Sequence, residues 1–123
     1  MKRRRFPIRQ NVYARAVTFL YGTASEINAV LNRDFPRGQD AQQLQSSGIG
    51  IWCVYTQDGY EADYICVVKR RDKTEELSSL AHECLHHVSH VLRKAGMPMT
   101  YDTDEAYCYY FGWVFRNCLE AMK

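Results

Sequence analysis

Two histidines and a glutamate stand close together in a stretch that is apolar at helical spacing: His82, Glu83 and His86. Residues four apart lie on one face of a helix, so both imidazoles can reach a single metal ion. Glu83 lies about 100° around the helix from His82, where it can hydrogen-bond a metal-bound water more easily than it can act as a ligand. Zinc lowers the pKa of such a water to about 7, and a carboxylate can then take its proton during attack on a carbonyl group. The pattern therefore predicts a hydrolytic zinc site.

A second interpretation of the same stretch is a helix that carries surface histidines, because His87 and His90 follow closely. The metal interpretation is favoured because the helix itself is well specified. Glu75 and Glu76 suit its first turn, and Gly96 marks its end. Five cysteines are spread along the chain without a CxxC pair, so a cysteine zinc site is not expected.

A zinc site of this kind needs a third protein ligand. Leu92 stands where one class of zinc enzymes has a third histidine, and His90 is about 12 Å from His82 along a straight helix. Glu105 is the favoured ligand, because eighteen residues separate it from His86 and it falls in the first turn of the next helix. A short loop between the two helices lets them pack antiparallel, which can turn Glu105 toward the histidines.

Other roles remain open in the segment around Glu105. Asp102 and Asp104 are alternative ligands. Asp102 and Glu105 would also form a capping box for the second helix. Gly112, two turns after Glu105, would allow the two helices to approach closely.

The pattern His82-Glu83-x-x-His86 followed by Glu105 resembles the gluzincin class of zinc metallopeptidases. The residues around these motifs are also similar to small metallopeptidase-like proteins encoded by phages and prophages, and the resemblance covers about residues 49–120. It implies zinc as the cofactor, bound by the two histidines and Glu105. It also implies that Glu83 is the general base and that the substrate is a peptide or a protein.

The elements that must position these residues follow from apolar periodicity and turn residues. Asp58-Gly59 joins two β-rich segments and tolerates the positive φ angles of a type I′ turn, which would pair Gln57 with Tyr60 and Cys53 with Tyr64. The expected elements are a strand over 11–21, a helix capped by Thr23 and Glu26 that ends near Asn32, a polar loop over 36–48, a hairpin over 49–69, a helix from Thr74 to about Lys94, and a helix from Asp102 almost to the terminus.

Together these elements predict an α+β fold: a small antiparallel sheet with an N-terminal helix and two C-terminal helices carrying a zincin-like metal site. Residues 1–10 are expected to form a basic N-terminal arm, and residues 11–123 a single metallopeptidase-like domain. An edge strand beside the helix of the site can bind an extended peptide through backbone hydrogen bonds. Either 49–56 or 62–69 can supply that edge.

Composition narrows the remaining classes. The formal charge of +2 is too small to indicate nucleic-acid binding, although a binder of that kind would use the basic clusters at residues 2–5 and 69–71. No apolar run approaches the roughly 18 residues that a membrane span needs. Charge also interrupts any leader-like apolar segment, so a cytoplasmic protein of a bacterial or phage-infected host cell is expected.

We therefore expect a zinc-dependent metallopeptidase-like hydrolase that cleaves peptide bonds. The alternative is a non-catalytic interaction protein that holds zinc on the same scaffold. A catalytic zinc site keeps an open coordination position, whereas a structural site is closed by four protein ligands.

Overall fold

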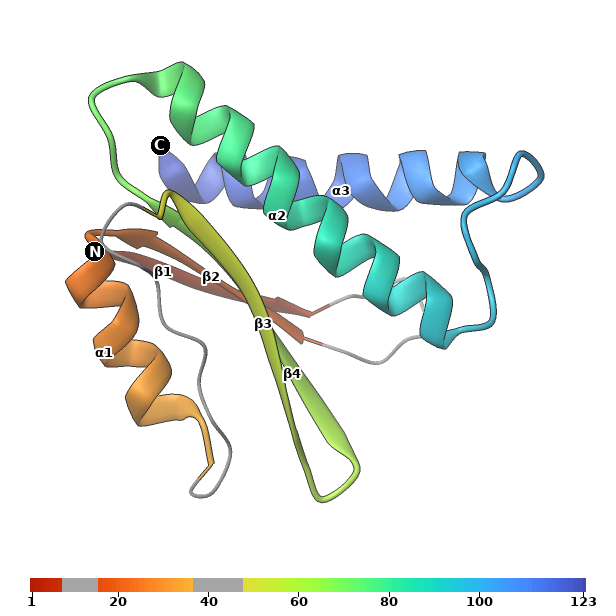
Figure 1. The fold of residues 1–123 in the computed structure, drawn as a ribbon, viewed down its shortest axis with the longest axis horizontal. Helices are drawn as coiled ribbons and strands as arrows, with labels where there is room; N and C mark the ends of the chain where they lie inside the picture. Colours follow the sequence, from red (N-terminus) through yellow and green to blue (C-terminus); the bar gives the residue numbers. More distant parts are fainter. Residues whose placement is uncertain (8–15, 37–47) are drawn as a thin grey trace.

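The computed structural model of the chain describes residues 1–7, 16–36 and 48–123. Its strands form one four-stranded sheet in the order β1-β2-β4-β3, and three helices pack on the two faces of that sheet (Figure 1). In chain order the elements are β1 (Lys2–Pro7), β2 (Ala16–Gly22), α1 (Ala24–Asp34), β3 (Gly50–Gln57), β4 (Tyr60–Val68), α2 (Lys73–Lys94) and α3 (Asp104–Met122).

The expected α+β class, with one N-terminal and two C-terminal helices, is confirmed. The expected wholly antiparallel sheet is wrong, because β2 and β4 pair in parallel, with Ala16 opposite Ala62. The other two ladders, β1 with β2 and β3 with β4, are antiparallel. The chain leaves β2 through α1 before it enters the hairpin, and the second hairpin strand rather than the first adjoins β2. The sheet is therefore mixed.

The first residues of the chain belong to the sheet. The sequence predicted a basic arm over residues 1–10, but Lys2–Pro7 form β1 along one side of β2. Phe6 explains this placement, because its ring is buried and meets Trp113 edge-on at a centroid distance of 5.6 Å. Four successive basic residues hide this apolar anchor in the sequence. Residues 8–15, which include part of the expected first strand, and residues 37–47 of the expected loop lie outside the described residues.

Two local predictions that rest on turn and cap chemistry are confirmed, the hairpin turn at Asp58-Gly59 and the capping box at Thr23. Asp58 and Gly59 have φ angles of 53° and 76°, and the ladder pairs Gln57 with Tyr60 as the two-residue turn requires. The Thr23 hydroxyl accepts a hydrogen bond from the backbone N–H of Glu26, and the Glu26 carboxylate accepts one from the backbone N–H of Thr23. This reciprocal capping box starts α1 directly after β2.

Strand alternation divides the core into two layers. On β2, Phe19 faces a cluster that includes Leu80 of α2 and Val114 of α3, whereas Leu20 faces a cluster that includes Ile27 of α1. The sheet thus has α2 and α3 on one face and α1 on the other, as Figure 1 shows. Within the described residues, no helix has both the length and the apolar character that a bilayer span requires.

Candidate metal centre

His82 and His86 lie near the middle of α2, and both side chains reach the solvent. Their Nε2 atoms are 3.2 Å apart. Two histidine ligands of a tetrahedral zinc ion, each with a Zn–N bond of 2.0–2.1 Å, hold their nitrogens about 3.3–3.4 Å apart. The donor pair therefore fits two corners of a zinc tetrahedron. Without a metal, the same separation suits a hydrogen bond between two neutral imidazoles.

Glu83 lies beside this pair but is turned into the protein, and only 8% of the residue is exposed. Its carboxylate accepts a hydrogen bond from the backbone N–H of Trp52, and its Oε1 atom is 3.7 Å from Nε2 of His82. Burial raises the pKa of Glu83, while the nearby His82 and the Trp52 N–H act in the opposite direction. A carboxylate with a raised pKa is a better proton acceptor near neutral pH than an exposed one. The structure thus brings three of the four predicted site residues together.

β3 is an edge strand in the described part of the chain, and it passes directly beside α2. The Ile49 carbonyl accepts a hydrogen bond from the N–H of Val68 at the end of β4. Main-chain groups of successive residues in a strand point in alternate directions, so those of Gly50 and Trp52 point away from β4. The Trp52 N–H uses this direction to reach Glu83. Of the two candidate edges left open by the sequence, the one over 49–56 is therefore the edge, and β4 is inside the sheet.

The Trp52 side chain also contacts two histidines of α2, His86 and His90. Its ring stacks on His86 at a centroid distance of 6.0 Å and an interplanar angle of 19°, and it meets His90 at 5.0 Å. These contacts restrict how the His86 imidazole can turn. Trp52 was not predicted as a site residue, because nothing in the sequence places it beside residues of α2 more than thirty positions away.

Gly50 sets how closely β3 and α2 approach. A Cβ atom at this position would lie 2.3 Å from Oγ of Ser79, 2.8 Å from the Cys66 carbonyl oxygen and 3.2 Å from Cγ of Glu83. The Ser79 hydroxyl donates to the Ile49 carbonyl over 2.9 Å, which fastens helix and strand together. A glycine inside a strand often marks such a close approach, so this signal was present in the sequence.

An open pocket of about 310 Å³ lies along this junction. Gly50 and Ser79 line it together with His82 and Glu83. The pocket gives a ligand access to the carboxylate and to one of the two imidazoles at once. This arrangement combines two imidazoles at a spacing that zinc would accept, a partly desolvated carboxylate and a neighbouring strand edge.

Glu105, the predicted third ligand, lies in the first turn of α3 and is exposed. The contact between Nε2 of His87 and the Tyr110 hydroxyl, 2.8 Å long, sets the register of the two helices. Glu105 precedes Tyr110 by five residues and His82 precedes His87 by five. In an antiparallel pair these offsets separate Glu105 from His82 by roughly 15 Å along the helices. Among the described residues, no three or more His, Cys, Asp or Glu side chains form a group that could hold a metal ion.

Two other expectations for α3 are wrong. The N-cap residue is Thr103, without a side-chain cap bond, so Asp102 and Glu105 do not form a capping box. Gly112 does not serve a close helix approach, because a Cβ atom there would meet nothing within 4 Å. Asp102 and Asp104 are exposed like Glu105.

The two other histidines of α2 have different surroundings. His87 is fully buried, and its Nδ1 atom is 2.9 Å from a carboxylate oxygen of the buried Asp63. His90 is 3.0 Å from a carboxylate oxygen of Glu61, which also pairs with Lys94. These partners give His87 and His90 structural contacts of their own, whereas His82 lines the pocket and His86 is exposed to solvent.

Comparison with known proteins does not add to this geometry. A scan of the chain against protein-family models found no match, and searches of the curated proteins and of the solved structures found none either. What bears on function is therefore the arrangement of α2 and β3 itself.

Proposed function

We propose that this chain is a zinc-dependent, metallopeptidase-like hydrolase that cleaves peptide bonds, with His82 and His86 as zinc ligands and Glu83 as the general base. One observation carries the proposal: the two Nε2 atoms are 3.2 Å apart and the Glu83 carboxylate lies 3.7 Å from one of them. The resemblance of this motif to the gluzincin class supports the same function.

In this proposal each side chain has a defined task. Zinc held by the two imidazoles would polarise a carbonyl group and lower the pKa of a water ligand. Glu83 accepts a proton in the pocket, and the Trp52 N–H keeps its carboxylate oriented. Apart from the Trp52 N–H, which Glu83 binds, the outward main-chain groups of β3 offer donors and acceptors to an extended peptide, a mode of recognition known as β-augmentation.

Glu105 remains the proposed third ligand, and it would have to come closer to the histidines than it is here. The first turn of α3 follows a nine-residue connection from α2, between Lys94 and Asp104. Replacement of Glu105 by glutamine is therefore the informative change. We expect weaker zinc binding in this variant, and unchanged affinity would remove Glu105 from the site.

Metal analysis tests the site. The purified protein should bind about one zinc ion per chain, and His86→Ala should lose it. His90→Gln is the matched control, because His90 lies on the same helix but pairs with Glu61. Equal zinc content in both variants would contradict the assignment.

Hydrolysis is tested with a library of quenched fluorescent peptides. Glu83→Gln should keep zinc and lose cleavage, because the amide can still accept the Trp52 N–H but cannot accept a proton. Cleavage that persists in this variant would exclude Glu83 as the base.

A second candidate function is a non-catalytic interaction protein that binds zinc on this scaffold. The observation that favours it is that, among the described residues, only two histidines lie together, without a third donor, and that Glu105 is exposed. Zinc binding with no cleavage of any peptide in the library would support this function over the first.

A further inference from the structure

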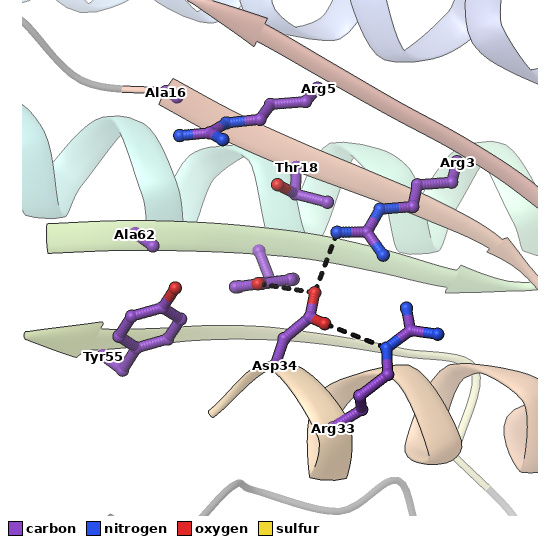
Figure 2. A pocket seen from close by; sticks show the side chains of 9 residues that line it. Arg3, Arg5, Ala16, Thr18, Arg33, Asp34, Tyr55 and Ala62 are labelled. Carbon is purple, nitrogen blue, oxygen red and sulfur yellow. Dashed lines mark hydrogen bonds and ion pairs between the residues drawn. The ribbon is translucent and has the colours of Figure 1, made fainter. Parts of the chain in front are cut away.

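A second pocket, of about 370 Å³, lies on the opposite face of the sheet from α2 and α3. Its charged and aromatic lining consists of Arg3, Arg5, Arg33, Asp34, Tyr55 and Tyr64. Figure 2 shows Arg3 and Arg5 reaching over β2 from one side, with Asp34 and Arg33 of α1 below them and Tyr55 across the pocket from Arg5. The pocket shares no lining residue with the candidate metal centre.

Strand alternation explains why basic side chains gather here. Phe6 packs toward α3, so Arg4 shares its face of β1 while Arg3 and Arg5 project onto the other face. The basic run at residues 2–5 is thus divided between the two sides of the sheet. Arg5 lies opposite Thr18 in the β1–β2 ladder, at the rim of the pocket.

Small side chains give the pocket its depth. Ala16 of β2 and Ala62 of β4 are ladder partners and line it side by side. α1 covers the neighbouring part of this face with Ile27 and Leu31. The hollow therefore begins where α1 ends, at Asp34.

Asp34 holds the surrounding groups in place. Its carboxylate accepts hydrogen bonds from Nη2 of Arg3 at 2.9 Å, from Nε of Arg33 at 3.3 Å and from the Tyr64 hydroxyl at 2.9 Å. Burial and the Asp34 carboxylate both raise the pKa of Tyr64, so its hydroxyl stays a donor. Each guanidinium has five N–H donors, and the Asp34 carboxylate takes one from Arg3 and one from Arg33. With three arginines and one aspartate, the pocket carries a net charge of +2.

We propose that this pocket binds a nucleotide, with the phosphate group on Arg3, Arg5 and Arg33 and the planar base against Tyr55. Arginine forks match phosphate oxygens in geometry and charge, and a phosphomonoester dianion balances the excess charge of the pocket. Tyr55 is half-buried and is held edge-on by Phe35 at a centroid distance of 5.1 Å, which fixes its ring before a ligand arrives. β1 and β3 are three strand spacings apart, about 14 Å, so the phosphate and the base bind at separate ends of one pocket.

The test uses adenosine 5′-monophosphate, adenosine and inorganic phosphate as probes, titrated calorimetrically into the full chain at low salt. We expect the monophosphate to bind more tightly than either fragment. A short oligonucleotide with and without a 5′-phosphate then distinguishes a free nucleotide from a strand end. Absence of monophosphate binding, or equal affinity for inorganic phosphate, would overturn the proposal.

Matched variants locate the binding. Arg5→Gln should weaken monophosphate binding on the order of tenfold, because it removes one charged contact. Arg4→Gln removes the same charge from the other face of the same strand and should have little effect. Arg33→Gln and Arg93→Gln form a second matched pair, because each arginine is exposed and lies in the last turn of its helix. Only Arg33 lines the pocket, so only Arg33→Gln should weaken binding. Equal losses within both pairs would show attraction by net charge alone and refute the pocket.

Tyr55→Leu tests the base end of the pocket. It should weaken binding of the monophosphate while leaving that of inorganic phosphate unchanged, because leucine is still apolar but has no ring face for the base. Thermal unfolding of every variant confirms that it is folded before binding is compared. If the ratio of the affinities for the monophosphate and for inorganic phosphate were the same in Tyr55→Leu as in the original chain, the base would not bind against Tyr55.

Discussion

Replacement of Gly50 by alanine tests the junction between β3 and α2 most directly. The new Cβ atom would lie 2.3 Å from the Ser79 hydroxyl oxygen and 2.8 Å from the Cys66 carbonyl oxygen. The hydroxyl can rotate away, but the carbonyl belongs to the adjacent strand β4 and cannot. Because Cγ of Glu83 also lies 3.2 Å from the new atom, β3 must shift away from both β4 and α2, and this shift would draw the Trp52 N–H away from Glu83.

The cost follows from these contacts. Forcing one extra carbon into a closely packed site costs about 1–3 kcal/mol. Loss of the hydrogen bond from Ser79 to the Ile49 carbonyl adds about 1 kcal/mol. Alanine also lowers the conformational entropy of the unfolded chain relative to glycine, which offsets roughly 0.5–1 kcal/mol of this destabilisation. We expect a net destabilisation of about 2 kcal/mol.

Urea unfolding followed by circular dichroism measures this change. With a slope of about 1–1.5 kcal/mol per molar for a chain of this size, the midpoint should fall by about 1.3–2 M. Gly112→Ala is the matched control, since a Cβ there meets nothing within 4 Å and alanine favours the helix by about 1 kcal/mol. If Gly50→Ala is as stable as the original chain, the proposed tight junction is refuted.

Two further predictions concern titratable groups. Burial raises the pKa of Glu83 above its usual 4.5. Between pH 4.5 and this raised value, the folded chain binds more protons than the unfolded chain. The free energy of unfolding therefore falls as the pH rises through this range. Glu83→Gln should gain stability relative to the original chain between pH 4 and pH 8, and a pH-independent difference would contradict this. Cys108 alone of the five cysteines is exposed, and burial raises the pKa of Cys53 to about 12. A thiol reagent should therefore modify one cysteine quickly in the folded original chain and all five after unfolding. In folded Cys108→Ser it should modify none quickly. A second cysteine that reacts quickly in the folded original chain would refute this.

The features that the sequence predicted correctly depend on neighbours in the chain. The turn at Asp58-Gly59 and the capping box of Thr23 and Glu26 involve residues at most three positions apart. The pairing of His82 with His86 is equally local, since helical periodicity brings them together. Each of these needs no knowledge of the tertiary fold.

The features that the sequence missed depend on packing between distant segments. The order of the strands is decided by β2 pairing with β4, and the register of α3 on α2 is decided by contacts such as that of Tyr110 with His87. The position of Glu105 follows from that register, so its spacing from His86 in the sequence could not place it. The arginine pocket was hidden for the same reason, because Arg3 and Arg5 come close to Arg33 and Tyr55 only when β1, α1 and β3 pack together.

The mixed sheet also sets an order in which the molecule can assemble. The β3–β4 hairpin closes through a two-residue turn, and α2 follows it directly in the chain, so this unit needs only short loops. Pairing of β2 with β4 must close a much longer loop that contains α1 and β3, at a greater entropic cost. Every residue of the candidate metal centre except Glu105 lies in the first unit. The histidine pair and its strand edge can therefore form early in folding, before the arginine pocket, which needs β1, β2 and α1 in place.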